Sequence, residues 1–212
     1  MLKGKLVYLR LFEPEDYEKT YKWHSDFDLM KSTVGPMRII SKEIERKWVL
    51  SKSENNREEI YLAICLVESD EMIGWYSISK IDHYNRKCIA SGIVIGEKEY
   101  RNGDIYIEAG YLAFEYIINE LNMNRVGAAC LRENVISRAE MESSFWHLEG
   151  VERQAVYKNG KYHDVCHYSI LRDEYMQNKE KEGFGVFDDK VRRLSKAIKR
   201  IRQELKELES LK

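Results

Sequence analysis

The sequence predicts an α+β (mixed α/β) fold: a central, mostly antiparallel, twisted sheet of six to seven strands with flanking helices, then a coiled-coil-like C-terminal helix. Short polar turns separate apolar or alternating runs, which is typical of hairpins. Two such runs flank a long helical pattern, which is typical of a strand–helix–strand crossover. A heptad pattern near the end of the chain predicts the last helix.

Local signals predict each element in turn. Alternation predicts the first strand, and a proline at the first turn predicts the helix after it. A serine with a glutamate nearby begins the second helix. A polar turn between apolar runs predicts the first hairpin, and an Asn-Gly pair predicts the last. The expected elements are strand Lys5–Leu11, helix Pro14–Trp23, a helix from Ser41, strands Ile60–Val67, Met72–Ile81 and Cys88–Ile95, a helix from Asp104 to Asn122, strand Arg125–Leu131, helix Asn134–Leu148, and strands Val151–Tyr157 and Tyr162–Leu171.

Some elements carry expectations about burial. The apolar run Cys88–Ile95 is nearly continuous, as in a strand covered on both faces. On the helix from Ser41, the residues expected to face the core are Ile44, Trp48 and Leu50. The four cysteines are widely spaced in apolar runs, so we expect reduced, buried thiols at Cys65, Cys88, Cys130 and Cys166.

Composition limits the classes of protein. The chain has 212 residues, 43% hydrophobic and 33% charged, which suits an ordinary globular core rather than disorder. A formal net charge of −1 gives no overall attraction to nucleic acid or membrane. The first apolar stretch is too short for a signal peptide, and no run approaches the ~18 apolar residues of a membrane span. We therefore expect a cytoplasmic protein without a membrane partner.

Several short fragments, in their order and spacing, resemble the GNAT N-acetyltransferase family. The resemblance covers about residues 2–175 and is greatest to the branch that acetylates ribosomal-protein N-termini, polyamines and amino-sugar nucleotides. It implies the GNAT fold and acetyl-CoA, or another acyl-CoA, as co-substrate. The fragments are Leu9-Arg10 before Glu13–Asp16, Ile73-Gly74, Gly92–Arg101, Asn122–Val126, Asn134 with Ser137, Glu149-Gly150 and Tyr157–Asp164.

The resemblance implies two devices for binding the cofactor. A splayed strand, Ser91–Ile95, would offer backbone groups of Ile93, Val94 and Ile95 to the pantetheine arm. A glycine-rich turn at the start of the long helix would hold the diphosphate with backbone N–H groups and the helix dipole. That turn is Arg101, Asn102, Gly103, Asp104, Ile105 and Tyr106.

The turn departs from the family pattern, Gln/Arg-x-x-Gly-x-Gly/Ala. Arg101 matches, but Asp104 and Tyr106 stand where small residues belong. Asp104 is also a natural N-cap, so its carboxylate could occupy the helix N-terminus itself. A second anion about 4 Å away would be opposed by roughly 1–4 kcal/mol.

Further departures concern the chemistry. Ala90 stands where related enzymes often have a glutamate base, and Met141 where many have a tyrosine acid. The usual Gly-Phe at the end of the last domain helix is Phe145-Trp146. Asn134 and Ser137 do match, and the resemblance implies that Asn134 contacts the cofactor arm and Ser137 the CoA sulfur. They are the candidate catalytic residues, although Asn134 could equally be only a helix cap and Ser137 an ordinary first-turn residue.

Other candidate residues have structural alternatives. His163 and His167 lie on one predicted strand face, but without a third ligand we expect no metal site. An acid–base role for His163 is weighed against a hydrogen-bonded strand histidine, which is favoured. The aromatic set near the family's acceptor cleft suits a flat substrate, with core packing favoured for Trp48 and Trp75; its members are Trp23, His24, Trp48, Trp75 and Tyr76.

The chain is expected to divide into a domain 1–176, a linker 177–187 around Gly183-Phe184-Gly185, and a helix 188–212. A seam of apolar residues predicts self-association, as an antiparallel pair or by docking onto a second subunit, because Glu204 and Glu209 would repel in a parallel dimer. A solvated face is favoured over a nucleic-acid contact for the basic residues of this helix. The seam is Val191, Leu194, Ile198, Ile201, Leu205 and Leu208; the basic residues are Lys190, Arg192, Arg193, Lys196, Lys199, Arg200 and Arg202.

The sequence thus predicts an acyl-CoA-dependent N-acyltransferase, specifically an N-acetyltransferase. Its acceptor would be a primary amine of a small molecule, an amino sugar or a peptide N-terminus, attacking the thioester directly. The alternative is a catalytically impaired protein of the same fold that serves in binding or assembly.

Overall fold

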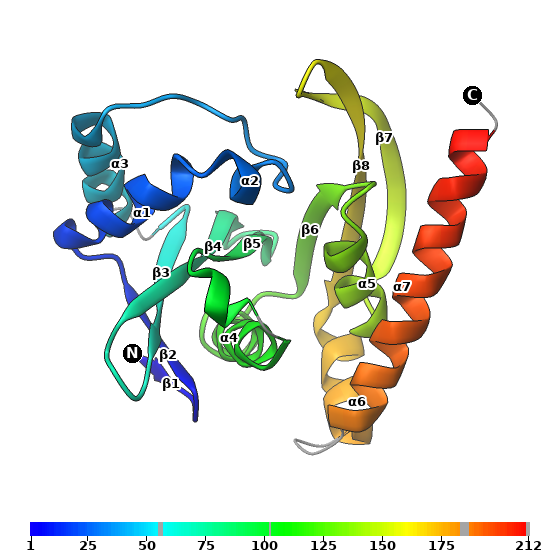
Figure 1. The fold of residues 1–212 in the computed structure, drawn as a ribbon. Helices are drawn as coiled ribbons and strands as arrows, with labels where there is room; N and C mark the ends of the chain where they lie inside the picture. Colours follow the sequence, from blue (N-terminus) through cyan, green and yellow to red (C-terminus); the bar gives the residue numbers. More distant parts are fainter. Residues whose placement is uncertain (55–56, 102, 183–186, 211–212) are drawn as a thin grey trace. The chain divides into compact units, whose positions relative to one another are not determined.

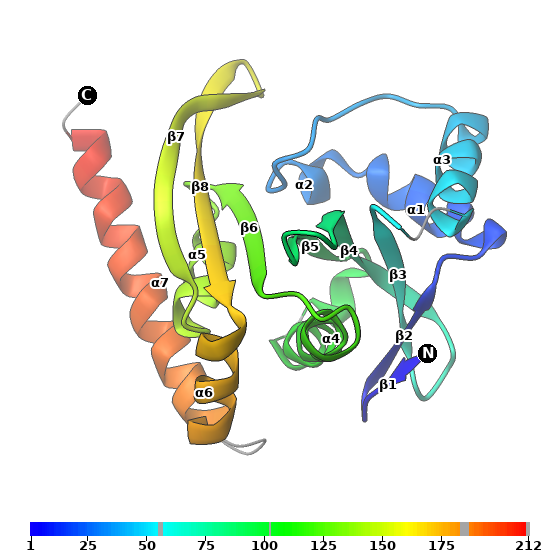
Figure 2. The same ribbon diagram turned by 180° about the vertical axis from the view of Figure 1, so that it is seen from behind.

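The computed structural model describes residues 1–54, 57–101, 103–182 and 187–210. The chain divides into two compact units. The first unit combines Met1–Lys31 with Met37–Asn124, and the second combines Ser32–Pro36 with Arg125–Lys212. Each unit has its own strands and helices (Figures 1 and 2).

The first unit has five antiparallel strands in chain order, and α4 packs against β1, β2, β4 and β5 while α1 packs against α3. The hairpin of β3 and β4 confirms the expected one. The strands are β1 (Leu2–Lys3), β2 (Val7–Leu11), β3 (Ile60–Leu66), β4 (Met72–Asp82) and β5 (Lys87–Ile95). The helices are η1 (Pro14–Asp16), α1 (Tyr17–His24), α2 (Phe27–Met30), α3 (Lys42–Glu54), η2 (Lys98–Tyr100), α4 (Gly103–Glu115) and the π-helical turn η3 (Tyr116–Glu120).

An ion pair between Arg10 and Asp16 explains the first fragment of the family resemblance, Leu9-Arg10 before Glu13–Asp16. Arg10, in β2, makes two parallel hydrogen bonds to the buried carboxylate of Asp16, of 2.7 and 2.8 Å. Asp16 also accepts the backbone N–H of Glu13 at 2.8 Å. Such a bidentate pair has a defined geometry, so it sets the turn that leads from β2 into α1.

The buried side of α3 was predicted incorrectly at Ile44, whose side chain is 55% exposed. Glu45 and Val49 face the core instead, with Trp48 half-buried beside them. The buried carboxylate of Glu45 lies 2.8 Å from Nδ1 of His24. Because His24 on α1 binds Glu45, the buried face of α3 contains Glu45 and Val49, one residue further along the chain than the face predicted from hydrophobicity.

In the second unit the strand order is β6-β8-β7, all antiparallel. The Asn-Gly turn is confirmed, since Asn159 and Gly160 have φ of 48° and 79°, as a type I′ hairpin requires. The strands are β6 (Arg125–Leu131), β7 (His147–Lys158) and β8 (Lys161–Leu171), and the helices are α5 (Val135–Ser143), α6 (Arg172–Glu182) and α7 (Phe187–Ser210).

Three boundaries differ from expectation. The described residues contain eight strands rather than six to seven, because the two-residue β1 also pairs with β2. Helix α5 ends at Ser143 instead of Leu148, since β7 begins at His147. Helix α6 covers 177–182 of the expected linker, while Gly183, Phe184 and Gly185 lie outside the described residues.

Burial confirms the expectation for the cysteines and contradicts the one for β5. All four cysteines are reduced and buried, as predicted. Strand β5 is not covered throughout, because its residues from Lys87 to Ser91 alternate between exposed and covered positions. In the portion of the chain that the structure describes, no helix has the length and apolarity to cross a membrane.

Gly96, directly after β5, packs against the indole of Trp23. A Cβ at Gly96 would lie 2.0 Å from Cε2 and 2.3 Å from Nε1 of that ring. We expect Gly96→Ala to lower the free energy of unfolding by about 1–3 kcal/mol, because the core is overpacked. Urea unfolding measures it, with Gly150→Ala as control, since no atom lies within 4 Å of a Cβ there. Equal midpoints for the two variants would refute the close packing.

Candidate functional site

Strand β5 carries a bulge where the splayed strand is expected. Gly92 pairs with Ser77 and Ala90 with Ile78, so Ser91 is an extra residue in the register of this strand pair, although its hydroxyl contacts that of Ser79 on β4. Gly92 has φ of 130°, and apart from its chain neighbours no atom in the described part of the chain lies within 4 Å of the position of a Cβ there. Bulges of this kind redirect a strand and are frequent beside active sites.

The remaining candidate residues of β5 follow the bulge. Ile93 and Val94 are half-buried and Ile95 is buried. All three pair along one edge with β4, opposite Tyr76, Trp75 and Gly74. Their side chains are apolar, so a polar ligand would meet them through their backbone groups.

Arg101 binds the C-terminal end of β5, the strand that precedes it in the chain. Its Nε donates to the carbonyl of Ile95 at 3.0 Å, and an Nη donates to that of Gly96 at 2.7 Å. Asp26 lies 3.9 Å from the same guanidinium. Arg101 therefore ties the segment after β5 back to the end of that strand, and these contacts engage its Nε and one Nη.

The start of α4 differs in detail from expectation. The helix begins at Gly103, so Asp104 lies in its first turn and not at the N-cap as predicted. Leaving aside its chain neighbours and the backbone of its own helix, no atom of the described residues lies within 4 Å of a Cβ built on Gly103. Ile105 is buried and packs inward, whereas Tyr106 is half-buried. The predicted residue Asn102 lies outside the described residues.

Glu97 is a carboxylate that sequence analysis missed. It accepts hydrogen bonds from Nζ of Lys22 at 3.1 and 3.2 Å and from Nε1 of Trp23 at 3.2 Å, and Nζ of Lys19 lies at 3.5 Å. Burial alone raises the pKa of Glu97, but these hydrogen bonds and lysine charges outweigh it, and the net pKa is lowered. A carboxylate of low pKa is a weak base near neutral pH. The only available signal was the fragment Gly96-Glu97 itself.

The aromatic set forms core. Trp23 and Trp75 are buried and stack at 5.8 Å, and Tyr76 is buried. His24 packs against Trp48 at 5.0 Å and against Trp75 at 5.1 Å. The core role predicted for Trp48 and Trp75 is confirmed, and Trp23 joins them.

In the second unit, Asn134 caps α5. Its side-chain oxygen accepts the backbone N–H of Ser137 at 3.1 Å, and its Nδ2 donates to the carbonyl of Ser32 at 2.9 Å. Ser137 is half-buried in the first turn, as the cap interpretation expects. The cap role of Asn134 is therefore present, and a cofactor contact stays a prediction.

Lys158 binds the same segment, Ser32–Pro36, which we call the strap. Its Nζ donates to the carbonyl of Thr33 and lies 3.3 Å from the hydroxyl of Thr33. Lys158 is buried, and burial lowers the pKa of its ammonium although the charge of Glu133 opposes this. Two side chains of the second unit thus hold consecutive carbonyls of the strap.

The two strand histidines have separate partners. Nδ1 of the buried His163 contacts the carboxylate of Glu133, and its Nε2 lies 3.1 Å from the carbonyl of Lys158. Nε2 of His167 lies 2.9 Å from Glu152. Within the described ranges, no cluster of three His, Cys, Asp or Glu residues could hold a metal ion. His163 therefore has the geometry of the hydrogen-bonded strand histidine favoured above.

The two positions expected to carry acid–base chemistry hold apolar side chains. Ala90 is buried in β5, and a methyl group cannot accept a proton. Met141 packs against the cluster of Cys130, Cys166 and Tyr168 in the core of the second unit. The structure therefore leaves the proton transfer without a base or acid at these positions.

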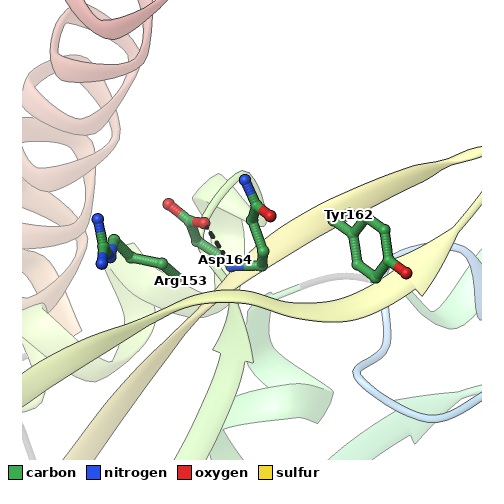
Figure 3. A pocket seen from close by; sticks show the side chains of 4 residues that line it. Arg153, Tyr162 and Asp164 are labelled. Carbon is green, nitrogen blue, oxygen red and sulfur yellow. Dashed lines mark hydrogen bonds between the residues drawn. The ribbon is translucent and has the colours of Figure 1, made fainter.

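A pocket of about 660 Å³ lies on the β7–β8 hairpin, lined by Arg153, Gln154, Tyr162 and Asp164 (Figure 3). Asp164 accepts the backbone N–H of Gln154 at 3.0 Å and a guanidinium N–H of Arg132 at 3.2 Å. Each carboxylate oxygen of Asp164 thus accepts a hydrogen bond from the protein. Sequence analysis did not identify it.

Comparison with known proteins gives a consistent result. The family model described as an acetyltransferase (GNAT) domain matches residues 7–144, more than half of the chain. The chain is 28% identical over 179 residues to the probable N-acetyltransferase YjcK of Bacillus subtilis, covering 82% of this chain and 98% of that protein. It is 33% identical over 110 residues to the putative ribosomal N-acetyltransferase YdaF of the same organism, covering 52% and 59%.

Solved structures share the fold. A GNAT-family acetyltransferase from Bacillus anthracis superposes with a TM-score of 0.70 at 24% identity, covering 82% of this chain and 99% of that one. A spermidine N-acetyltransferase from Vibrio cholerae, in complex with CoA and spermine, gives a TM-score of 0.74 at 19% identity with the same coverage. Both identities are too low to carry more than the fold.

Glu97 makes stability depend on pH. Because its folded pKa is lowered, its contribution is present above the ordinary value of 4.5 and is lost as pH falls through the folded pKa. At pH 7 we expect Glu97→Gln to cost about 1 kcal/mol of unfolding free energy, since lysines bind the charged form. The difference in unfolding free energy between the variant and wild type should decrease as pH falls below 4.5. Urea unfolding at several pH values measures it; the exposed Glu99→Gln is the control. A gap independent of pH would contradict the ionised state.

Proposed function

Because the chain belongs to the GNAT acetyltransferase family, we propose that it transfers an acyl group, specifically acetyl, from CoA to a primary amine. The observation that carries the proposal is the bulged end of β5, with open space at Gly92, followed by a helix that begins at Gly103. This combination offers backbone groups and a helix N-terminus to one phosphorylated, extended ligand. The acceptor would be a small molecule, an amino sugar or a peptide N-terminus, in the cytoplasm.

The residues present fit acyl-CoA in part. Backbone groups of Ile93, Val94 and Ile95 would meet the pantetheine arm, and the first-turn amides from Gly103 the diphosphate. The absence of neighbouring atoms at Gly103 favours this close approach. The carboxylate of Asp104 opposes it, because it lies in the same first turn.

Asn134 and Ser137, in the second unit, are the other groups proposed to contact the ligand. The Asn134 side chain keeps one further N–H beyond the one given to Ser32. That N–H and the Ser137 hydroxyl are the groups proposed for the cofactor arm and the thioester sulfur. Since Ala90 and Met141 carry no proton-transfer groups, the amine would have to arrive deprotonated, and positioning would supply most of the rate enhancement.

A binding or assembly protein that has lost turnover is the second candidate. The apolar Ala90 and Met141, together with Asp104 at the helix start, favour it. The two candidates differ in acetyl-CoA binding, which isothermal titration calorimetry measures directly.

Removing the charge of Asp104 should improve cofactor binding. We expect Asp104→Asn to lower the Kd for acetyl-CoA at least about fivefold, since a like charge about 4 Å away costs roughly 1–4 kcal/mol. The matched control is Glu120→Gln at the far end of the same helical run, about 24 Å away, where salt screening leaves the Kd within about twofold.

Asn134→Ser separates the cap from the cofactor contact. Serine still caps a helix but has no amide, so the proposal expects weaker acetyl-CoA binding in a stably folded variant. If neither wild type nor Asp104→Asn binds acetyl-CoA at millimolar concentration, the acyl-CoA proposal fails and the binding-protein candidate is left.

Self-association through α7 is a separate proposal. Its support is the seam, in which Leu194, Ile198, Leu205 and Leu208 are only half-buried within the chain. Light scattering well above micromolar concentration should then give a mass above that of one chain. A monomer mass would overturn the proposal.

A further inference from the structure

We propose that α7 is an intramolecular clamp on α5 and that Glu204 is a positioning residue for the N-terminus of α5. This inference rests on the proposed function only in so far as α5 carries Asn134 and Ser137. Helix α7 runs beside α5 within the second unit (Figures 1 and 2). Polar side chains of α7 contact both α5 and its flanking residues.

The carboxylate of Glu204 is shared by two arginines. One oxygen accepts from an Nη of Arg138 at 2.8 Å, and the other from an Nη of Arg132 at 3.2 Å. Arg138 is only 3% exposed, so its charge requires a partner inside the protein. The nearest other carboxylate, that of Glu142, lies at 3.8 Å.

The two arginines stand on either side of Asn134. Arg132 follows the end of β6, two residues before the cap, and Arg138 lies four residues after it. Arg138 also donates through its other Nη to the carbonyl of Arg132 at 3.1 Å, and through its backbone N–H to the carbonyl of Asn134 at 3.1 Å. Glu204 therefore ties together the strand end, the cap and the first turn of α5.

Helix α7 also holds the C-terminal end of α5. Nε of Arg193 donates to the carbonyl of Ser143 at 3.0 Å, and its guanidinium lies 4.7 Å from the ring of Phe145. Phe145 has φ of 62°, a left-handed conformation that is costly for a bulky residue. Arg200 pairs with Glu142, the penultimate residue of α5, and Ile201 of α7 is fully buried.

Each of the two arginines already has one buried N–H group without a hydrogen-bond partner among the described residues. These groups are Nε of Arg132 and Nε of Arg138. If Glu204 loses its charge, Arg138 loses its 2.8 Å partner and keeps, among the described residues, the carboxylate of Glu142 at 3.8 Å, so the arginine must move or draw in water. Either response shifts the first turn that presents Ser137 and Asn134.

The test compares full-length wild type with Glu204→Gln and Glu204→Asp. We expect Glu204→Gln to raise the Kd for acetyl-CoA about tenfold or more, because a displacement of about 1 Å at a site has effects of this order. Glu204→Asp, which keeps the charge, should recover part of the loss. The control is Glu207→Gln on the exposed face of α7, with an unchanged Kd.

Hydrogen exchange gives a readout independent of the cofactor. In Glu204→Gln, exchange of the Ser137 and Arg138 amides should accelerate at least about tenfold while amides of β8 stay protected, as in local opening. Unchanged exchange at these amides overturns the clamp. Faster exchange with an unchanged Kd for acetyl-CoA overturns the positioning role. If wild type binds no acetyl-CoA, the proposed function fails, and the exchange result alone decides the clamp.

Discussion

The buried guanidinium of Arg138 is the constraint on which the second unit depends. A permanently charged group with 3% exposure requires anionic partners nearby, and the chain supplies the closest one, Glu204, from its C-terminal helix. Because the same carboxylate also binds Arg132, the end of β6 and the start of α5 are joined to α7 by one ion cluster. The C-terminal helix is therefore part of the packing of its own unit.

A departure from the family pattern and the C-terminal extension are physically linked. Phe145 stands where the resemblance to the family implies a glycine, and it takes the positive φ that glycine adopts without strain. The carbonyl of Ser143 at that helix end is satisfied by Arg193 of α7, whose guanidinium also lies over the Phe145 ring. The left-handed cap itself is kept, because the N–H of Trp146 donates to the carbonyl of Met141 at 3.0 Å. The side chain of Arg193 therefore adds to this cap and stabilises the strained residue.

In the first unit, Trp23 joins several segments, as Glu204 does in the second unit. Its indole packs on Gly96, stacks on Trp75 and donates to Glu97. Together with the bonds from Arg101 to the carbonyls of Ile95 and Gly96, these contacts hold the end of β5 against α1. The loop before α4 is therefore anchored by protein contacts on one side, while Gly92 and Gly103 leave space on the other.

By itself, the sequence predicted the order of the strands and helices apart from β1, α2 and α6, together with the two hairpins, the reduced cysteines and the family, because periodicity, turn residues and motif spacing act locally along the chain. It also located Asn134 as a cap, since capping involves residues three positions apart. Only the tertiary structure decided which face of α3 is buried, because Glu45 turns inward to a histidine on another helix. It likewise decided the contacts of Glu97, the attachment of the strap to Asn134 and Lys158, and the pairing of Glu204 with two arginines. In each of these cases a buried or half-buried polar group finds a partner remote in sequence, and a hydrophobic pattern contains no information about such a partner.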